Sequence, residues 1–153
     1  MNIVIGEYIT IVDPEDAHFL EDKRWGVYLL DGKPYVRGWY NGKNEALHRL
    51  ICNTPSKMFT DHINGNTLDN RRSNLRQCTN GQNQANSKVK KNNKSGYKGV
   101  ARVSKHRWRA KINKDNNRID LGLHESPELA ARAYDNAAVR IHGQFARLNF
   151  PKS

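Results

Sequence analysis

The most regular alternation of apolar and polar residues in the chain lies at residues 107–113, RWRAKIN. Trp108, Ala110 and Ile112 occupy every second position, and basic or polar residues fill the positions between them. Because successive side chains of a strand point to opposite faces, this stretch predicts a strand with one apolar and one basic face. GYKGVARV and RIDLGLH are strand candidates before and after it, and KDNN at residues 114–117 predicts the turn between the last two strands.

A helical pattern follows these strands. Ser126 suits the N-cap, Pro127 suits the first helical position, and Gly143 suits the position after the last turn. Between them runs an apolar stripe at helical spacing, made of Leu129, Ala130, Ala133, Tyr134, Ala137, Ala138 and Ile141. The small alanines would let this helix lie close to a three-stranded sheet, so the other face of that sheet stays open and is basic.

Residues 1–45 have the pattern of a β-rich segment. IVIGEYITIV holds β-branched and aromatic residues suited to strands. Asp31-Gly32 and Asn41-Gly42 are hairpin turn pairs between apolar or aromatic runs. DPEDAHFLED predicts one short helix, with Asp13 as its N-cap and Pro14 at its first position. We expect Trp25 and Trp39 to be core residues rather than a base-stacking platform.

Residues 46–90 begin and end with helical signals. ALHRLIC predicts one or two helical turns, with Leu47, Leu50 and Ile51 facing inward. Thr79-Asn80-Gly81-Gln82 fits a capping box, which predicts a short helix from about Asn80. Asn83 and Asn86 would share a face of that helix. The Asn-rich stretch between the two signals has no simple periodicity.

The distribution of charge along the chain indicates the kind of partner that it binds. The formal net charge is +11, the hydrophobic content is 37% and the mean hydropathy is −0.88. Residues 1–45 hold 5 Lys/Arg and 8 Asp/Glu, whereas residues 46–90 hold 7 and 2, and residues 91–153 hold 14 and 5. This distribution favours a polyanionic partner, nucleic acid, that binds the last two thirds of the chain. Residues 87–95, SKVKKNNKS, predict a basic linker.

Several classes of protein do not fit the sequence. No stretch approaches the roughly 20 apolar residues that span a bilayer, and MNIVIGEYIT lacks the features of a signal peptide. We therefore expect a soluble cytoplasmic protein that is not secreted and does not bind membranes. Cys52 and Cys78 form no CxxC pair, which predicts two reduced thiols, buried or half-buried.

The candidate chemistry lies in TDHINGNTLDN, residues 60–70. A neutral histidine can accept a proton from water near pH 7, and a carboxylate with amide oxygens can hold Mg²⁺. If Asp61 and His62 end a strand, their side chains diverge, so one could hold a metal while the other faces the water. Taken alone, the pair indicates a solvated polar loop far more often than a catalytic site.

The motifs of residues 46–90 taken together are more specific than the Asp61-His62 pair alone. DHINGN, LDNRRSNLR and QNQAN, together with the lead-in LHRLI, strongly resemble the HNH endonucleases of the His-Asn-Asn branch, typical of phage and intron-encoded homing enzymes. The resemblance covers roughly residues 46–90 and implies a ββα-metal finger. It implies that His62 is the general base, that Asn74 orients its ring by a hydrogen bond, and that Asp61 and Asn83 bind a divalent cation, Mg²⁺ or Mn²⁺. Further candidate positions are phosphate contacts at Arg72 and Arg76, and a structural or DNA-contact role for His48.

The last part of the chain resembles the AP2 DNA-binding domain of plant transcription factors. The matching phrases are GYKGV, RWRAKI, LGLHESPELAARAYDNAA and GQFARLNF. The resemblance implies a three-stranded sheet in the major groove, a groove wide enough for β structure. Its implied DNA contacts are Lys98, Lys105, Arg109, Lys111, Asn113 and Arg118. Ala101, Val103 and Asp120 depart from the Arg or Trp usual in the plant domains, so their DNA site is not transferred.

These observations predict an α+β protein in four parts: a β-rich segment at 1–45, an HNH nuclease domain at 46–90, a basic linker at 91–95 and an AP2-like domain at 96–153. The expected function is a metal-dependent endonuclease of the homing type, anchored on double-stranded DNA by the AP2-like sheet; if phage-encoded, it would act in the host cytoplasm. The alternative is a non-catalytic DNA-binding regulator. RNA binding or cleavage is a third possibility, disfavoured because a major-groove reader should prefer B-form DNA.

Overall fold

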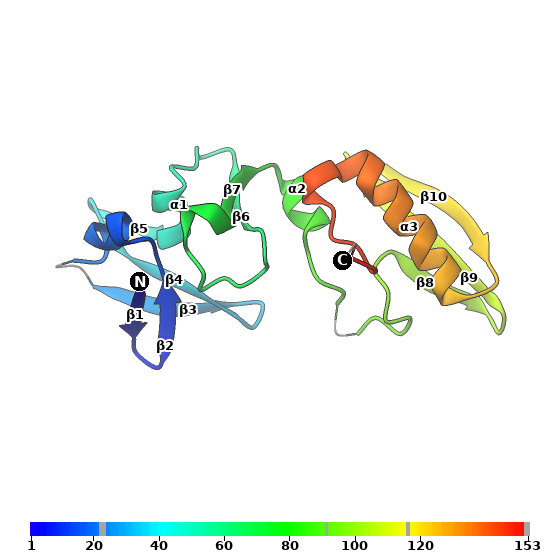
Figure 1. Ribbon diagram of the computed structural model, residues 1–153, viewed down its shortest axis with the longest axis horizontal. Helices are drawn as coiled ribbons and strands as arrows, with labels where there is room; N and C mark the ends of the chain where they lie inside the picture. The colour runs from blue at the N-terminus through cyan, green and yellow to red at the C-terminus, as the bar shows by residue number, and fades with distance from the viewer. Residues whose placement is uncertain (22–23, 91, 116, 152–153) are drawn as a thin grey trace. The chain divides into compact units, whose positions relative to one another are not determined.

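The computed structural model describes residues 1–21, 24–90, 92–115 and 117–151, and the chain divides into two compact units, Met1–Thr79 and Asn80–Ser153 (Figure 1). Several small antiparallel sheets alternate with short helices, which confirms the α+β prediction. Lys91 of the predicted linker and Asn116 of the predicted KDNN turn lie outside the described residues.

The first unit opens with a hairpin of β1 (Asn2–Ile5) and β2 (Tyr8–Ile11). The predicted helix after it is a 3-10 helix, η1 (Pro14–Phe19), with Pro14 at its start as expected. Asp13 is the N-cap residue, as predicted, but its side chain makes no cap hydrogen bond. Its Oδ2 instead accepts the backbone N–H of Arg72 at 2.8 Å.

A three-stranded antiparallel sheet follows, in the order β3 (Trp25–Leu30), β4 (Lys33–Tyr40), β5 (Lys43–Ala46). Both predicted hairpin turns are confirmed. Asp31 and Gly32 have φ of 51° and 72°, and Asn41 and Gly42 have φ of 46° and 77°. Two consecutive left-handed residues match the right-handed twist of the flanking strands, which is why Asp-Gly and Asn-Gly occur there.

The core of the first unit joins this sheet to α1 (Leu47–Ile51), the helix predicted from ALHRLIC. Val12, Val36, Leu47, Ile51 and Leu75 form its buried cluster. Trp25 packs against that cluster and donates its indole N–H to the carbonyl of Phe19 at 3.0 Å, as expected of a core tryptophan. The same expectation is wrong for Trp39, whose side chain is 62% exposed.

The remainder of the first unit is a two-stranded ribbon of β6 (Phe59–His62) and β7 (Leu75–Cys78), with the 3-10 turn η2 (Arg72–Asn74) before β7. The loop from residue 63 to residue 71 is tied to β2, since Ile11 donates to the carbonyl of Leu68 and Asn70 donates to the carbonyl of Ile11. The N-terminal hairpin therefore supports the segment between Asp61-His62 and Asn74.

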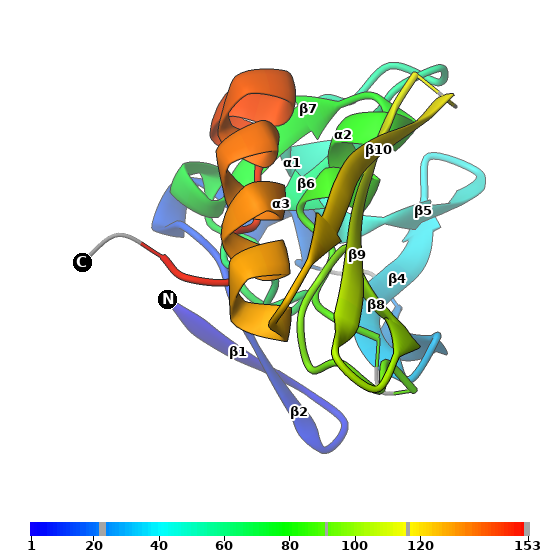
Figure 2. The ribbon, with the colours of Figure 1, turned by 90° about the vertical axis from the view of Figure 1, so that its right-hand side faces the viewer.

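The second unit is a sheet covered by one helix. It begins with α2 (Asn80–Ala85), the helix predicted from the capping box, and continues with the antiparallel sheet β8 (Val100–Ser104), β9 (Arg107–Lys114), β10 (Asn117–His124). The helix α3 (Pro127–His142) runs along one face of the sheet, followed by η3 (Gly143–Phe145) (Figure 2). Nowhere in the described ranges is a helix both long and apolar enough to cross a membrane.

The packing of α3 follows the predicted pattern except at Leu129, a member of the predicted apolar stripe that is 52% exposed. Ser126 caps the helix by accepting the N–H of Leu129 at 3.1 Å, and Pro127 stands at its first position. Ala110 and Ile112 are buried against the alanines of α3, and Trp108 packs beside them, which confirms the apolar face expected of RWRAKIN. The basic and polar residues of β9 consequently occupy the opposite face of the sheet.

Both cysteines are unpaired thiols, Cys52 half-buried and Cys78 buried, as predicted. Burial raises the pKa of the Cys78 thiol to about 11, so it stays protonated at neutral pH.

Gly99 lies directly against Tyr134 of α3. Its φ is +75°, and a Cβ built on it would collide with the ring of Tyr134 and lie 2.7 Å from the carbonyl oxygen of Lys111. Gly96 has the same φ, yet a Cβ there would meet nothing within 4 Å. The two glycines thus separate the cost of steric overlap from the cost of a left-handed backbone.

We expect Gly99→Ala to destabilise the second unit by about 3 kcal/mol or more, because Tyr134 and the backbone of β9 must both move. Gly96→Ala is the matched control and should cost only about 1–2 kcal/mol, the price of the left-handed conformation. Differential scanning calorimetry of the full chain measures both. Equal losses in the two variants would contradict the packing described for Gly99.

Candidate active site

Asp61 and His62 end β6, and their side chains diverge as the sequence pattern predicted. In the register of the ribbon, Asp61 lies opposite Arg76 and His62 lies opposite Leu75. Both polar side chains are buried, at 4% and 5% exposure. Burial of adjacent ionisable groups is costly unless each has partners, so their contacts decide what the pair can do.

The ring of His62 is held by Asn70. The Nε2 atom lies 3.1 Å from Oδ1 of Asn70, which is only 1% exposed. Asn70 Nδ2 donates to Oγ1 of Thr10 at 2.8 Å, and that hydroxyl in turn donates to the carbonyl of Leu68. The hydroxyl therefore accepts a hydrogen bond from the amide, so the Asn70 oxygen faces the ring and accepts a hydrogen bond from Nε2–H.

This chain of hydrogen bonds fixes the tautomer of His62. When the neutral ring carries its proton on Nε2, the lone pair that can accept a proton resides on Nδ1. Burial lowers the pKa of His62, and the charge of Lys33 acts in the same direction. The hydrogen bond that His62 donates to Asn70 and the charges of Asp61 and Asp69 act in the opposite direction. A lowered pKa keeps the imidazole neutral at pH 7, the form that a general base requires.

Asn74 has a different role from the predicted one. Its Oδ1 accepts the backbone N–H of Asn64 at 2.9 Å, and its Nδ2 donates to the carbonyl of Asp69 at 2.7 Å. Both ends of the amide are occupied by the backbone of the 63–71 loop, so Asn70, not Asn74, makes the hydrogen bond to the His62 ring. Asn74 orients the histidine only through the loop that carries Asn70.

Two further rings enclose His62. The centroid of the His48 ring lies 5.1 Å from that of His62, and the ring of Tyr35 lies 6.2 Å from His62 and 5.6 Å from His48. Burial lowers the pKa of His48 to about 3, helped by His62, Arg49 and Arg37. His48 is thus a neutral packing partner of the site, which fits the structural role expected for it.

The two arginines expected at phosphates are paired with carboxylates inside the unit. Arg76 donates to Oδ2 of Asp61 through Nε at 2.8 Å and through Nη2 at 2.7 Å. Arg72 donates through Nε to Oδ2 of Asp16 at 2.8 Å, and Asp16 is fully buried. The second pair fastens η2, which carries Asn74, to η1.

The candidate metal ligands fall in both units. Asp61 lies in β6 of the first, and Asn83 lies half-buried on α2 of the second. Within the described ranges, no group of three or more His, Cys, Asp or Glu side chains could hold a metal ion. One carboxylate and one amide oxygen still suit Mg²⁺, which keeps several of its waters.

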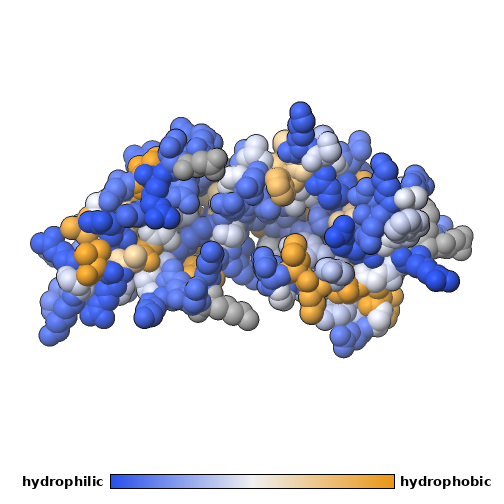
Figure 3. Space-filling view, turned by 180° about the vertical axis from the view of Figure 1, so that it is seen from behind, coloured by the Kyte–Doolittle hydropathy of each residue, from blue (hydrophilic) through white to orange (hydrophobic). Residues whose placement is uncertain are grey.

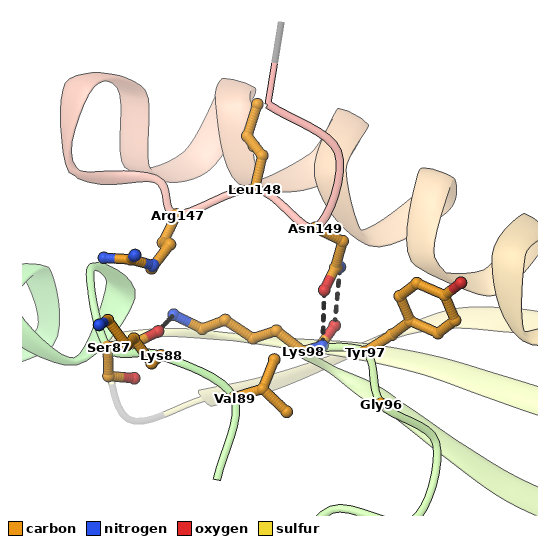
Figure 4. Close-up of a pocket in the computed structure, with 9 residues that line it drawn as sticks. All are labelled: Ser87, Lys88, Val89, Gly96, Tyr97, Lys98, Arg147, Leu148 and Asn149. Carbon is orange, nitrogen blue, oxygen red and sulfur yellow. Dashed lines mark hydrogen bonds between the residues drawn. The ribbon is translucent and has the colours of Figure 1, made fainter.

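Lys98, expected on the DNA face, points elsewhere. Its ammonium donates to the carbonyls of Gln84 at 3.2 Å and Ser87 at 2.8 Å, and to that of Ala85 between them (Figure 4). These carbonyls lie at and just beyond the C-terminal end of α2, where a positive charge is favourable. Lys98 therefore fastens α2 to the strand that begins at Val100.

The other predicted DNA contacts are presented by the sheet of the second unit. Arg109, Lys111 and Asn113 alternate along β9, and Arg118 of β10 lies opposite Asn113. Lys105 is exposed in the turn after β8. An acidic residue interrupts this surface, because Asp120 lies opposite Lys111 and its Oδ2 is 3.6 Å from Nε of Arg109.

Sequence reasoning missed Thr10, Tyr35 and Asn70. Asn70 stands within LDNRRSNLR, so the motif contained it, but nothing in the spacing distinguishes it from Asn74. Thr10 and Tyr35 come from strands far away in the sequence, and their place beside His62 is a product of the tertiary fold.

Comparison with known proteins gives this geometry a context. The profile of the HNH endonuclease family matches residues 45–85. An HNH endonuclease of Acanthamoeba polyphaga mimivirus is 33% identical over 138 residues, which cover 78% of this chain and 72% of that protein. Protein 3.8 of Escherichia phage T7 is 35% identical over 95 residues, 61% of this chain and 77% of that protein.

The remainder of the chain is similar to plant proteins. An AP2/ERF and B3 domain-containing protein of Oryza sativa subsp. japonica is 47% identical over 57 residues, which cover 37% of this chain and 16% of that protein. The match to the mimivirus protein extends over most of both chains, and the family profile includes Asp61, His62, Asn74 and Asn83. The chain belongs to the HNH endonuclease family.

Proposed function

We propose that this nuclease is a metal-dependent DNA endonuclease of the homing type, which hydrolyses a phosphodiester of double-stranded DNA as a nick or a double-strand cut. The observation that carries the proposal is the buried imidazole of His62, neutral at pH 7 and held by Asn70 through Nε2. A histidine restrained in this way suits a general base better than a surface contact. The viral relatives support action inside a host cell, its cytoplasm if the gene is a phage gene.

In the proposed reaction, Nδ1 of His62 accepts a proton from the attacking water while the water oxygen forms its bond to phosphorus. The bond from phosphorus to the leaving oxygen then breaks. Asp61 and Asn83 would hold Mg²⁺, or Mn²⁺ in its place, which would neutralise charge on the phosphate and on the leaving oxygen. Arg76 would then exchange its carboxylate partner for a phosphate oxygen, because Asp61 would turn its charge to the cation.

The AP2-like sheet would supply the anchor on duplex DNA. Arg109, Lys111, Asn113 and Arg118 would face the major groove, and Lys105 would contact a phosphate at the sheet's turn. In this proposal the cations set position on the DNA, while Asn113 and Arg109 are the candidates for reading bases. Affinity should fall steeply with salt, because each phosphate contact releases counterions.

One observation favours a second function, a non-catalytic DNA-binding regulator. The carboxylate of Asp61 is already paired with Arg76, and a permanent pair would compete with a metal ion. The buried imidazole of His62 favours the enzyme, and the Asp61–Arg76 ion pair favours the regulator. A direct assay of DNA cleavage decides between them.

We expect the purified chain with Mg²⁺ to nick or linearise supercoiled plasmid DNA, and EDTA to abolish the cutting. His62→Ala should lower the rate by about 10²–10⁴-fold, the usual contribution of a general base, while binding in a mobility-shift assay persists. His18→Ala, at an exposed histidine of η1, is the matched control and should cut as well as the wild type. No cutting with either Mg²⁺ or Mn²⁺ would favour the regulator.

We expect Asn70→Ala to lower kcat by on the order of 100-fold and to leave KM nearly unchanged, because the ring of His62 loses its orientation but DNA contacts do not change. Thr10→Val removes only the outer link of the chain and should have a smaller effect in the same direction. Single-turnover cleavage of labelled plasmid, with circular dichroism to check folding, measures both. A folded Asn70→Ala enzyme with wild-type kcat would contradict the role of Asn70.

We expect Asp120→Asn to strengthen binding of duplex DNA severalfold, because it removes a negative charge from a surface that faces phosphates. Glu125→Gln removes an exposed carboxylate in the loop before α3 and should change affinity much less. Fluorescence anisotropy with a labelled duplex, at two salt concentrations, gives the affinities. Weaker binding by Asp120→Asn would argue that this face of the sheet does not meet DNA.

A further inference from the structure

The first unit has a second surface with the composition of a nucleic-acid contact. Residues directly opposite each other in an antiparallel sheet share a face, as do alternate residues along a strand. The pairs Tyr28–Tyr35, Leu30–Lys33 and Gly26–Arg37 therefore lie on the same face of the β3–β4–β5 sheet. Trp39 lies on it too, opposite Asn44. This surface, the Trp39 face, consists of Tyr28, Leu30, Lys33, Tyr35, Arg37 and Trp39.

The Trp39 face is the side of the sheet turned away from the core. Trp25, Val27 and Val36 belong to the other side and pack into the hydrophobic cluster of the first unit. On the Trp39 face, by contrast, Tyr28 and Trp39 are each 62% exposed and Leu30 is 60% exposed. The side of the molecule seen in Figure 3 is mostly hydrophilic, with scattered apolar groups. Large exposed aromatic side chains on one face indicate a binding surface.

The charges on this face favour a polyanion. Lys33 and Arg37 are exposed and alternate with the aromatic residues along β4. The nearest acidic group in the sequence is Asp31 in the hairpin turn, and six of the eight acidic residues of 1–45 precede Trp25. The negative charge of the N-terminal segment therefore belongs to other elements, and it does not exclude nucleic acid from the Trp39 face.

The face also continues into the active site. Tyr35 belongs to it, and the ring of Tyr35 lies 6.2 Å from that of His62. Lys33 is close enough for its charge to lower the pKa of His62, after the larger effect of burial. A strand that presented a phosphate to His62 would therefore have its neighbouring nucleotides beside the Trp39 face.

We propose that the Trp39 face binds the DNA strand next to the scissile phosphodiester, with Lys33 and Arg37 on phosphates and with Tyr28 and Trp39 against bases or sugars. This proposal rests on the proposed endonuclease function for the identity of its partner. Stacking on aromatic rings is independent of base sequence. This surface would therefore bind the strand without contributing to the sequence specificity of cleavage. A second copy of the chain is a poorer occupant, because self-pairing of the face would oppose Lys33 and Arg37 to like charges.

Photochemical crosslinking tests the proposal without cleavage. The full chain with His62→Ala is irradiated with a short duplex of random sequence that contains 5-bromodeoxyuridine, and crosslinked peptides are identified by mass spectrometry. We expect crosslinks at Tyr28 or Trp39. The double variant Lys33→Ala/Arg37→Ala should lower their yield at least about fivefold, since two phosphate contacts are lost.

Matched controls lie on the opposite face of the same sheet. Leu29→Ala changes an exposed leucine next to Leu30, and Lys43→Ala removes an exposed cation opposite Tyr40. Both should leave the crosslinks unchanged. Crosslinks that map only outside the Trp39 face would overturn the proposal, and so would an equal loss of crosslinks in the control variants. It is also overturned if sedimentation velocity shows a dimer that Trp39→Ala dissociates while the yield of DNA crosslinks stays the same.

The plasmid cleavage assay distinguishes failure of this proposal from failure of the proposed endonuclease function. Crosslinks at the Trp39 face from a wild-type chain that cuts no plasmid would uphold the DNA surface and overturn the endonuclease function. Cutting without such crosslinks would overturn the surface alone.

Discussion

The hydrogen bond between Asn70 and the ring of His62 is the interaction on which the candidate active site depends. It connects the end of β6 to a loop, and through Thr10 it connects that loop to the N-terminal hairpin. The backbone contacts of Ile11 with Leu68 and Asn70 hold the same three parts together. A buried imidazole needs such a partner, because an unsatisfied ring nitrogen in the interior costs about 1–3 kcal/mol. The N-terminal segment thereby has a function, which is to support the loop behind His62.

Part of the positive charge of each unit is used to build its structure. Arg72 pairs with the buried Asp16, Arg76 pairs with Asp61, and Lys98 donates to the carbonyls at the end of α2. Because Asp16 and Asp61 are buried, loss of either arginine would leave an uncompensated carboxylate. The net charge of +11 already counts both carboxylates, so these two ion pairs do not reduce it. Exposed cations occur on a sheet face in each unit, and also at Lys88, Lys90 and Lys94 and on α3.

Features that depend on local sequence were predictable, and features that depend on long-range contacts were not. The turns at Asp31-Gly32 and Asn41-Gly42, the start of α2 and the cap at Ser126 follow from rules that span a few residues. The exposure of Trp39 did not follow, because β4 has apolar or aromatic residues on both of its faces and the pattern cannot show which face is covered. The choice of Asn70 over Asn74 depended on where Thr10 lies, 60 residues away in the sequence. Lys98 lies in the turn before β8, so the strand pattern predicted for GYKGVARV could not place its side chain.

The tautomer of His62 tests the account most directly. Long-range ¹H–¹⁵N correlation spectra of the ¹⁵N-histidine-labelled chain near pH 7.5, with His62 assigned by the His62→Ala spectrum, report which ring nitrogen carries the proton. The account predicts a neutral ring protonated at Nε2, with its lone pair on Nδ1. A ring protonated at Nδ1, or an imidazolium at that pH, would contradict the assignment of His62 as the base.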